Sequence, residues 1–466
     1  MMIRVSLVLA CALAVPGCEV VPYRCHTNAQ CVDQDAIAGI CEPDGYCSFP
    51  DTNCSAATRR YADGAGDSKA GTCVVASERG CVSDIAGGDN HLCLVRSDRT
   101  VWCWGANEAG QLGDGTTQDR ALPVQAKTPA GKGFVKVSAA ENHTCALGMD
   151  GTVWCWGSND SGQLGVVDSA GGLRPDSPLP IQVMTTSGTA PPTAVPLLAT
   201  HLAAGGKHTC VIDPASAVVC WGENDSGQCG QDPAAGDDVL VPTTVADLAE
   251  GFVDVTADKS TTAVVKDDGS LFEFGDNASG QLGIGTTTNS FAAVRAKITS
   301  VVTAAGGDEH VCAVKSDGTI WCWGYGAALG LAGGTDQPLP QRILSGTSVW
   351  AGGSSFHTCA VQNAALLCWG QNDQGQLGTG IIEPNSPTVF TPVRALLATV
   401  ERATSSQGTT CAVTVDGELW CWGANDRGQL ARGATTAADA VPARVELSCQ
   451  GTASAAAGQT PPRPRG

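Results

Sequence analysis

Short segments rich in cysteine, histidine, tryptophan and aspartate recur along this chain, and such residues form disulfides, bind metal ions or stack on sugars. One segment, His143 to Gly165, reads HTCALGMDGTVWCWGSNDSGQLG. Taken alone, it could be a metal site, a sugar platform or a catalytic centre. A catalytic site is usually unique in its chain, so the recurrence of this segment favours an architectural role.

The repeats are marked by a Gly that follows an aromatic residue, at positions about 50 residues apart. Self-similar units of this length, built from short strand-like segments and Gly-rich turns, are typical of a β-propeller or another repeat array. No heptad or 3.6-residue apolar pattern is sustained, so we expect almost no helix after the N-terminal segment. The sequence therefore predicts an all-β fold, a seven-bladed β-propeller, with the marker glycines Gly105, Gly157, Gly222, Gly275, Gly324, Gly370 and Gly423.

The composition limits the class of partner. Charged residues make up only 16% of the 466 residues and Gly numbers 58, which suits turn-rich β structure. Acidic residues outnumber basic ones by 46 to 27, for a net charge of -19 and a pI near 4.6. With no run of Lys or Arg, the chain is predicted not to bind nucleic acid, and its acidity indicates solubility.

The first residues, MMIRVSLVLACALAVPGC, have the features of a secretory signal: one Arg, an apolar run and small residues before Cys18. The apolar run is too short for a permanent membrane span. The ending VPGC resembles a bacterial lipobox and predicts lipidation of Cys18. Pro16 departs from that pattern, so cleavage without lipidation stays open. We expect export to the cell envelope, as an outer-membrane or cell-surface lipoprotein, or secretion.

Export makes disulfides the default state of the cysteines. The unit TTAVVKDDGSLFEFG has Ala263 and Glu273 where the others have two cysteines, as expected if a bonded pair is lost together. In the other six units two cysteines flank a turn: Cys93 and Cys103, Cys145 and Cys155, Cys210 and Cys220, Cys312 and Cys322, Cys359 and Cys368, Cys411 and Cys421.

Hairpin geometry agrees with these pairs. A three-residue loop, Met149 to Gly151, with Gly151 left-handed, sets Cys145 opposite Cys155. At a non-hydrogen-bonded pair the Cα atoms lie about 4.5 Å apart, within disulfide range. Each hairpin offers two cysteines and at most one His, too few for a tetrahedral zinc site. We predict six disulfides, no metal and no cofactor.

The remaining cysteines fall into three groups. Cys81 and Cys449 flank the repeats and are candidates for a disulfide that closes the ring, with Cys73 to Cys449 as the alternative. Cys229 stands in GQCG where other units read GQLG, which predicts a buried free thiol in a Leu pocket. A polar N-terminal segment is predicted to be a small disulfide-stapled module of unassigned pairing, with Cys25, Cys31, Cys41, Cys47 and Cys54.

Three other repeated residue types are interpreted as architecture. The tryptophans alternate with cysteine in strands such as VWCWG and are expected to fill space between blades. The aspartates of the N-x-x-G turns, at 160, 225, 373 and 426, supply one carboxylate per turn, too few for calcium. The histidines are expected to be buried and hydrogen-bonded within their own blade, with Thr261 and Thr409 replacing them in two units: His91, His143, His208, His310 and His357.

The segments HTCAL, DGTVWCWG and NDSGQLG together resemble the regulator of chromosome condensation repeat family over about residues 82–449. This resemblance implies a seven-bladed propeller. Members include exchange factors for small GTPases, parts of ubiquitin ligases and a secreted bacterial inhibitor of β-lactamases. The paired cysteines depart from the intracellular members and suggest an exported bacterial lipoprotein variant.

We expect residues 1–17 to be a signal peptide, 18–80 a Cys-rich segment, 81–449 the propeller and 450–466 a disordered tail. The stretch Val166 to Thr200 is rich in Pro, Ser and Gly and is predicted to protrude from one face of the ring. The units of the propeller span about residues 82–132, 133–198, 199–250, 251–299, 300–346, 347–399 and 400–449.

No nucleophile, base and orienting group occur at a recognisable spacing, so we predict no enzyme, with an unrecognised hydrolase or lyase as a minor alternative. The predicted function is an exported, lipid-anchored binding or scaffold protein, monomeric, that presents a propeller face to a protein or cell-surface partner and touches the membrane only through its lipid. One alternative is a secreted propeller-type enzyme inhibitor. Another, disfavoured by export, is a regulator similar to guanine-nucleotide exchange factors.

Overall fold

The computed structural model describes residues 40–41, 47–50, 59–61, 81–186, 193–235, 238–352, 355–383 and 388–447. The chain divides into two compact units, Met1–Gly80 and Cys81–Gly466. In the first unit, β1 (Ile40–Cys41), β2 (Cys47–Pro50) and β3 (Arg59–Tyr61) form a three-stranded sheet. Lipidation of Cys18 and the cysteine pairing of this unit stay predictions, because Cys18, Cys25, Cys31, Cys54 and Cys73 lie outside the described residues.

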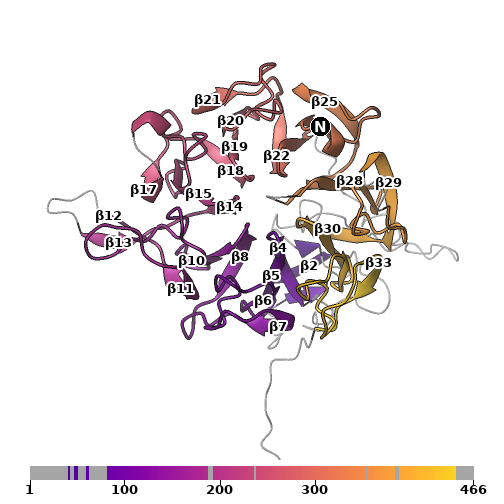
Figure 1. Cartoon of the computed structure of the whole chain (residues 1–466), viewed down its shortest axis with the longest axis horizontal. Coiled ribbons are helices and arrows are strands. Elements are labelled where there is room, and N and C mark those ends of the chain that lie inside the picture. Colours follow the sequence, from indigo (N-terminus) through magenta and orange to yellow (C-terminus); the bar gives the residue numbers. More distant parts are fainter. Residues whose placement is uncertain are drawn as a thin grey trace, which may run out of the picture. The chain divides into compact units, whose positions relative to one another are not determined.

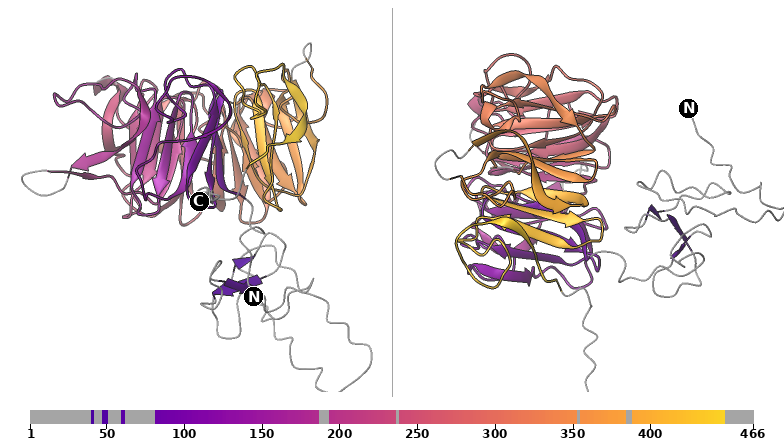
Figure 2. Two further views of the ribbon diagram at one scale, coloured as in Figure 1. Left: turned by 90° about the horizontal axis from the view of Figure 1, so that it is seen from below. Right: turned by 90° about the vertical axis from the view of Figure 1, so that its right-hand side faces the viewer.

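The second unit is a ring of seven four-stranded antiparallel sheets around a central axis (Figure 1). Each sheet takes its strands in chain order, and each falls in one of the seven predicted repeats. In edge-on views the strands run across the thickness of the ring (Figure 2). This is the all-β seven-bladed propeller that the repeats predicted.

The first four blades have the following strands. Blade 1 has β4 (Val82–Gly87), β5 (His91–Arg96), β6 (Val101–Gly105) and β7 (Arg120–Gln125). Blade 2 has β8 (Phe134–Ala139), β9 (His143–Gly148), β10 (Val153–Gly157) and β11 (Ser177–Gln182). Blade 3 has β14 (His201–Ala204), β15 (His208–Ile212), β16 (Val218–Gly222) and β17 (Val239–Thr244). Blade 4 has β18 (Phe252–Ala257), β19 (Thr261–Lys266), β20 (Leu271–Gly275) and β21 (Ser290–Arg295).

The last three blades follow the same order. Blade 5 has β22 (Val301–Gly306), β23 (His310–Lys315), β24 (Thr319–Gly324) and β25 (Gln337–Ser345). Blade 6 has β26 (Ser348–Trp350), β27 (His357–Gln362), β28 (Ala365–Gln371) and β29 (Thr388–Ala398). Blade 7 has β30 (Val400–Ser405), β31 (Thr409–Thr414), β32 (Leu419–Gly423) and β33 (Asp439–Arg444).

The marker glycine of each repeat ends the third strand, and its conformation explains its recurrence. Gly157 has φ +101°, and a Cβ there would lie 2.5 Å from the carbonyl oxygen of Asn142. The pairing of β10 with β11 shifts between Cys155 and Gly157, so the chain bulges at this point. A side chain would be both strained and obstructed, because L residues rarely adopt positive φ.

The described residues contain two short 3-10 turns and no longer helix, as the sequence predicted. They are η3 (Pro233–Ala235) and η4 (Gly326–Ala328), and η4 lies in the degenerate repeat YGAALG. Over the described ranges, no helix has the length and apolarity needed to cross a membrane.

The ring closes without strand exchange, since blade 7 consists only of C-terminal strands and blade 1 only of strands near Cys81. Side chains join the two instead. The Trp104 indole donates to the Gln429 carbonyl at 2.7 Å, and Arg427 pairs with Glu108 at 2.7 Å. Cys81 is buried and disulfide-bonded. Its predicted bridge to Cys449 stays a prediction, because Cys449 lies outside the described residues.

The stretch Val166 to Thr200 corrects one expectation. It supplies β11, the outer strand of blade 2, followed by β12 (Met184–Thr186) paired with β13 (Ala194–Pro196). The β12–β13 pair extends outward from the perimeter of the ring (Figure 1) rather than from one face. Because the whole stretch was predicted to protrude, no strand of the blade was expected within it, whereas β11 is the fourth strand of blade 2.

Candidate functional site

The six cysteine pairs lie within the hairpins formed by the second and third strands of their blades. Cys145 pairs in register with Cys155, with Cα atoms 4.1 Å apart and the sulfurs bonded. The loop has Gly151 at φ +79°, as the three-residue turn requires. In blade 4 the positions face each other in the same way, as Ala263 and Glu273. The other bonded pairs are Cys93–Cys103, Cys210–Cys220, Cys312–Cys322, Cys359–Cys368 and Cys411–Cys421.

The histidines make the contact that sequence reasoning placed wrongly. The Nε2 of His143 lies 3.0 Å from Oγ1 of Thr209, which belongs to the next blade and not to its own. Thr209 donates its hydroxyl proton to the carbonyl of Gln163 at 3.0 Å, so the imidazole must donate to the threonine. Each such histidine therefore donates through Nε2 and connects one blade to the next.

This relay occurs at five of the seven interfaces, always between a histidine and a threonine of the following blade. That threonine precedes the first hairpin cysteine, or Ala263 in blade 4. Burial lowers the pKa of His143 to about 3, so the imidazole stays neutral near pH 7. The Nε2 to Oγ1 distances at the other four are 2.8 Å for His91–Thr144, 2.8 Å for His208–Thr262, 2.7 Å for His310–Thr358 and 2.7 Å for His357–Thr410.

Two interfaces lack the relay, and both partners differ there. Between blades 4 and 5, Thr261 replaces the histidine and Val311 the threonine. Between blades 7 and 1, the replacements are Thr409 and Leu92. Thr261 donates instead to the Asp276 carbonyl of its own blade at 3.0 Å, which is the local hydrogen bond that the sequence predicted. The histidine and the threonine thus occur as a pair across an interface.

The interface between blades 4 and 5 holds two carboxyl groups. Asp258 is 1% exposed and Glu273 is fully buried. None of their four oxygens has a hydrogen-bond partner. Burial, followed by the charge of a neighbouring carboxylate, raises the pKa of both groups well above the usual range. Sequence reasoning noted Glu273 only as a replaced cysteine and missed Asp258, although an Asp at a position held by Gly, Ala or Ser in other repeats was a signal.

In six blades the residue before the marker glycine is a tryptophan that binds the preceding blade, and in blade 4 it is Phe274. Trp156 is fully buried and donates its indole N–H to the Gln111 carbonyl at 2.9 Å. The same carbonyl accepts the hydroxyl of Thr144, so one oxygen receives two donors from the next blade. These indoles are occupied between blades and are not available to stack on a sugar.

The turns after the marker glycine are held by their own side chains. The Asn159 side-chain oxygen accepts the Leu164 N–H at 2.9 Å, and the Gln163 side chain accepts the Ser161 N–H at 2.9 Å. Leu164 is fully buried. Among the described residues, no three His, Cys, Asp or Glu side chains are grouped so that they could hold a metal ion.

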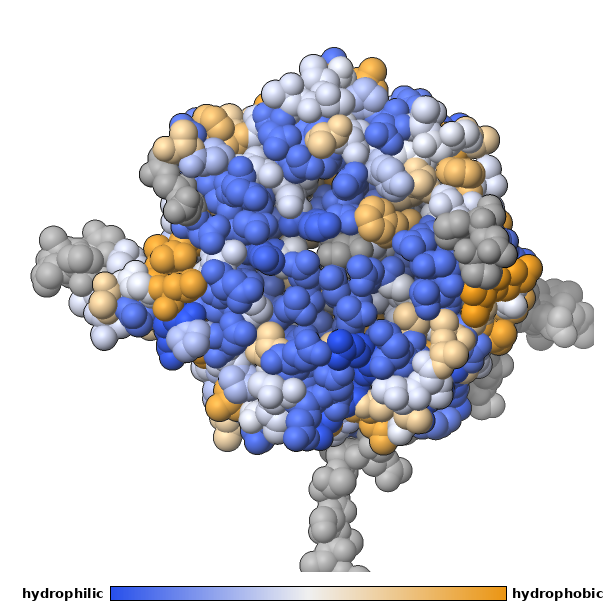
Figure 3. Space-filling view, viewed as in Figure 1, coloured by the Kyte–Doolittle hydropathy of each residue, from blue (hydrophilic) through white to orange (hydrophobic). Residues whose placement is uncertain are grey.

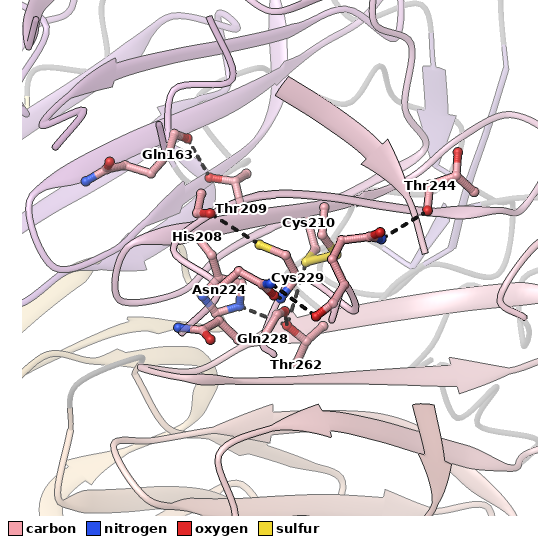
Figure 4. The surroundings of a disulfide bond; sticks show 12 residues. Gln163, His208, Thr209, Cys210, Asn224, Gln228, Cys229, Thr244 and Thr262 are labelled. Carbon is pink, nitrogen blue, oxygen red and sulfur yellow. Dashed lines mark hydrogen bonds between the residues drawn. A yellow bond between two sulfur atoms is a disulfide. The ribbon is translucent and has the colours of Figure 1, made fainter. Parts of the chain in front are cut away.

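Cys229 is the one free cysteine among the described residues, and it is fully buried. Its thiol donates to the Glu223 carbonyl at 3.2 Å and lies beside the Cys210–Cys220 hairpin (Figure 4). Burial raises the pKa of this thiol well above its usual value. A thiol of raised pKa is a poor nucleophile at neutral pH, so Cys229 fills the leucine position of its turn.

A channel runs along the axis, with a cavity of about 470 Å³ lined by the innermost strands of all seven blades. The wall carries charges of both signs, from Asp84, Lys136, Asp254, Glu401 and Arg402. Arg402 lies 3.8 Å from Asp84, and Thr303 donates to Asp254 at 2.7 Å. Trp350, the tryptophan outside the repeat pattern, also lines the channel. Unlike the side chains between blades, these residues border open space and differ from blade to blade.

The face shown in Figure 3 is largely hydrophilic around the channel mouth, and its apolar side chains lie mainly towards the rim. Together these features define a seven-bladed propeller whose most reactive side chain types are buried between blades. The side chains that a partner can reach are those of the channel and the loops.

Comparison with known proteins identifies the family. A family model described as RCC1-like domain matches residues 183–460, more than half of the chain. Models of the regulator of chromosome condensation (RCC1) repeat match residues 98–147 and 150–212, and also 82–111 and 134–163. The chain belongs to the RCC1-like domain family, as the repeat motifs indicated.

Relatives with different names share this propeller. The chain is 29% identical over 370 residues to the ultraviolet-B receptor UVR8 of Arabidopsis thaliana, covering 75% of this chain and 78% of the receptor. It is 28% identical over 323 residues to the human regulator of chromosome condensation, covering 63% and 73%. It is 27% identical over 349 residues to the human E3 ubiquitin-protein ligase HERC2, covering 72% of this chain but only 7% of the ligase.

A solved structure agrees on the fold. Yeast RCC1 (Prp20), crystallised bound to Kap60, superposes with a TM-score of 0.64 at 20% identity, covering 74% of this chain and 83% of that one. At this identity the likeness concerns the fold alone.

Proposed function

We propose that this chain is an exported, lipid-anchored, non-enzymatic binding or scaffold protein that presents one propeller face to a protein or cell-surface partner. One observation carries the proposal. The repeated imidazoles, indoles and sulfurs make contacts within or between blades. These are the residue types that resemble a catalytic centre in the sequence of one repeat. Solvent contacts the loops and the channel instead, and these are the parts in which the blades differ.

The relatives support binding as the general role, since their names describe a receptor and a regulator. Export rests on the N-terminal signal pattern and on the six hairpin disulfides, which persist in oxidising compartments. Because export separates the chain from intracellular small GTPases, we do not propose nucleotide exchange on a small GTPase as its function. A protein inhibitor of an exported enzyme is a special case of the binding function and is one outcome of the experiment below.

The two faces of the ring can be distinguished in a cross-linking experiment. Lys207 and Lys259 lie in loops between the first and second strands, whereas Lys266 and Lys315 end second strands at the opposite face. The full mature chain serves as bait on native cell envelopes with an amine-reactive cross-linker. We expect a reproducible protein partner cross-linked to one lysine pair and not the other. Absence of a partner, together with turnover of an envelope substrate, would overturn the proposal.

The anchor has its own test. Mass spectrometry of the mature N-terminus is expected to find Cys18 as the first residue with a lipid adduct. An unmodified N-terminus at any other residue would exclude the anchor and leave the binding proposal standing.

A further inference from the structure

The interface between blades 4 and 5 differs from the other six in its chemistry. Five interfaces are filled by a neutral imidazole bonded to a threonine, and the interface between blades 7 and 1 by Thr409 and apolar Leu92. Between blades 4 and 5, Thr261 replaces the histidine and Val311 the threonine. This interface instead holds two carboxyls, those of Asp258 and Glu273, and Glu273 stands where other blades have the second cysteine of the hairpin disulfide.

Asp258 fits this interface only because its neighbour is small. A Cβ on Gly306, in the first strand of blade 5, would lie 1.3 Å from the Asp258 carboxyl oxygen. Gly306 has no positive φ, so the backbone itself does not demand glycine there. The Asp258 carboxyl therefore lies against the backbone of the neighbouring blade, where no hydrogen bond satisfies it.

Other charged groups around this interface do not neutralise the pair. Lys259 forms an ion pair with Asp308 at 3.1 Å across the interface. The ammonium of Lys259 is therefore paired with Asp308 and not with Asp258 or Glu273. Glu309 accepts the Ser279 hydroxyl at 2.7 Å, also from blade to blade. The charge of Asp308 raises the pKa of Asp258 further, beyond the effect of burial. His310 of blade 5 is neutral and bonded to blade 6.

The Trp323 indole of blade 5 lies beside Glu273 and opposes the rise of its pKa, but its N–H donates to the Gln281 carbonyl at 2.8 Å. The two buried carboxylates therefore carry a large desolvation cost, and their mutual repulsion adds to it. Protonation removes the repulsion and the charge, which is the larger part of the desolvation cost, so the closed interface favours the protonated pair. Blade 4 is also the blade without a hairpin disulfide, so its strands are the least constrained.

We propose that the interface between blades 4 and 5 is a pH-sensitive seam of the ring, closed when Asp258 and Glu273 are protonated and loosened when they ionise. The sign follows from linkage. A carboxyl whose pKa is raised by folding binds its proton more tightly in the folded state, so stability falls as the pH rises from the unfolded value, about 4, through the folded one. The seam therefore loosens on the alkaline side.

The test is hydrogen exchange measured by mass spectrometry on the full mature chain at pH 6 and pH 9, with rates corrected for intrinsic exchange. Peptides from β18 to β24 report the seam, and peptides from β8 to β16 report interfaces with the relay. We expect protection of the seam peptides to fall at least tenfold more than that of the relay peptides between these pH values.

Two variants distinguish an effect of carboxyl ionisation from a generally low stability of blade 4. Asp258→Asn with Glu273→Gln removes the ionisation and should abolish the extra loss at pH 9. Ala263→Cys with Glu273→Cys removes one carboxyl and supplies the missing disulfide, so it should reduce the loss of protection at pH 9. This second variant also keeps the test valid if the first one does not fold. The proposal is wrong if wild type and both variants lose protection equally between pH 6 and pH 9. It is also wrong if the seam peptides of wild type lose no more protection than the relay peptides.

Discussion

Acidification is expected to destabilise the ring, because five imidazoles are buried between its blades. Burial lowers the pKa of His143 from 6.5 to about 3. Between these values the unfolded chain binds more protons than the folded one, so stability is lost as the pH falls below about 6.5. At pH 5 the loss is about 2 kcal/mol for one such histidine, at about 1.36 kcal/mol per pKa unit. Five together reach about 10 kcal/mol, the size of a typical domain's whole stability.

The assay compares wild type with His143→Gln. The glutamine amide can still donate to Thr209 but does not titrate. Guanidinium unfolding is followed by tryptophan fluorescence at pH 7 and pH 5 without reductant. We expect the variant to lose about 2 kcal/mol less than wild type between the two pH values.

Two features make this comparison decisive. The buried carboxyls of blade 4 act in the opposite direction, gaining stability on acidification, but they do so in both proteins and cancel in the difference. His201→Gln is the matched control, because His201 is only partly buried and its pKa is lowered less than that of His143. An equal loss in wild type and His143→Gln would refute the assignment of a buried neutral imidazole.

Three further outcomes follow from the interfaces. Ala263→Cys with Glu273→Cys should form a seventh hairpin disulfide, seen by mass under nonreducing conditions, and raise stability by about 2 to 3 kcal/mol. Gly306→Ala should destabilise wild type by more than about 1 kcal/mol but be tolerated when Asp258 is also Ala, so a double-mutant cycle should give a coupling of that size. Thr209→Val should cost about 1 to 3 kcal/mol in denaturant unfolding, because it leaves its imidazole donor unpaired.

Features confined to one hairpin could be derived from the sequence. Cys145 and Cys155 lie opposite each other because of the loop length and the conformation of Gly151. The alternation of side chains along each strand places both sulfurs on the same face of the hairpin. These inferences need only neighbours along the chain. The same repeats fixed the number of blades and the all-β class, because each unit carries its own turn signals.

Contacts between blades could not be derived in this way. His143 and Thr209 are 66 residues apart, and hairpin geometry says nothing about which side of a blade meets the next. A signal was nevertheless present: the unit after each histidine has a threonine just before the position of its first hairpin cysteine. The units after Thr261 and Thr409 have Val311 and Leu92 there. Reading the repeats in pairs around the ring, instead of one by one, would have found it.

The two interfaces without a relay have different physical causes. Blades 7 and 1 are the last and first blades along the chain, and they meet through apolar packing and through the ion pair of Arg427 with Glu108. Blades 4 and 5 are consecutive, so topology offers no reason for the change. At both interfaces a threonine, Thr261 or Thr409, replaces the imidazole, so losing the imidazole does not require carboxyls. Carboxyls at Asp258 and Glu273 cost more unless protonated. Their presence at a continuous interface therefore points to titration at this seam.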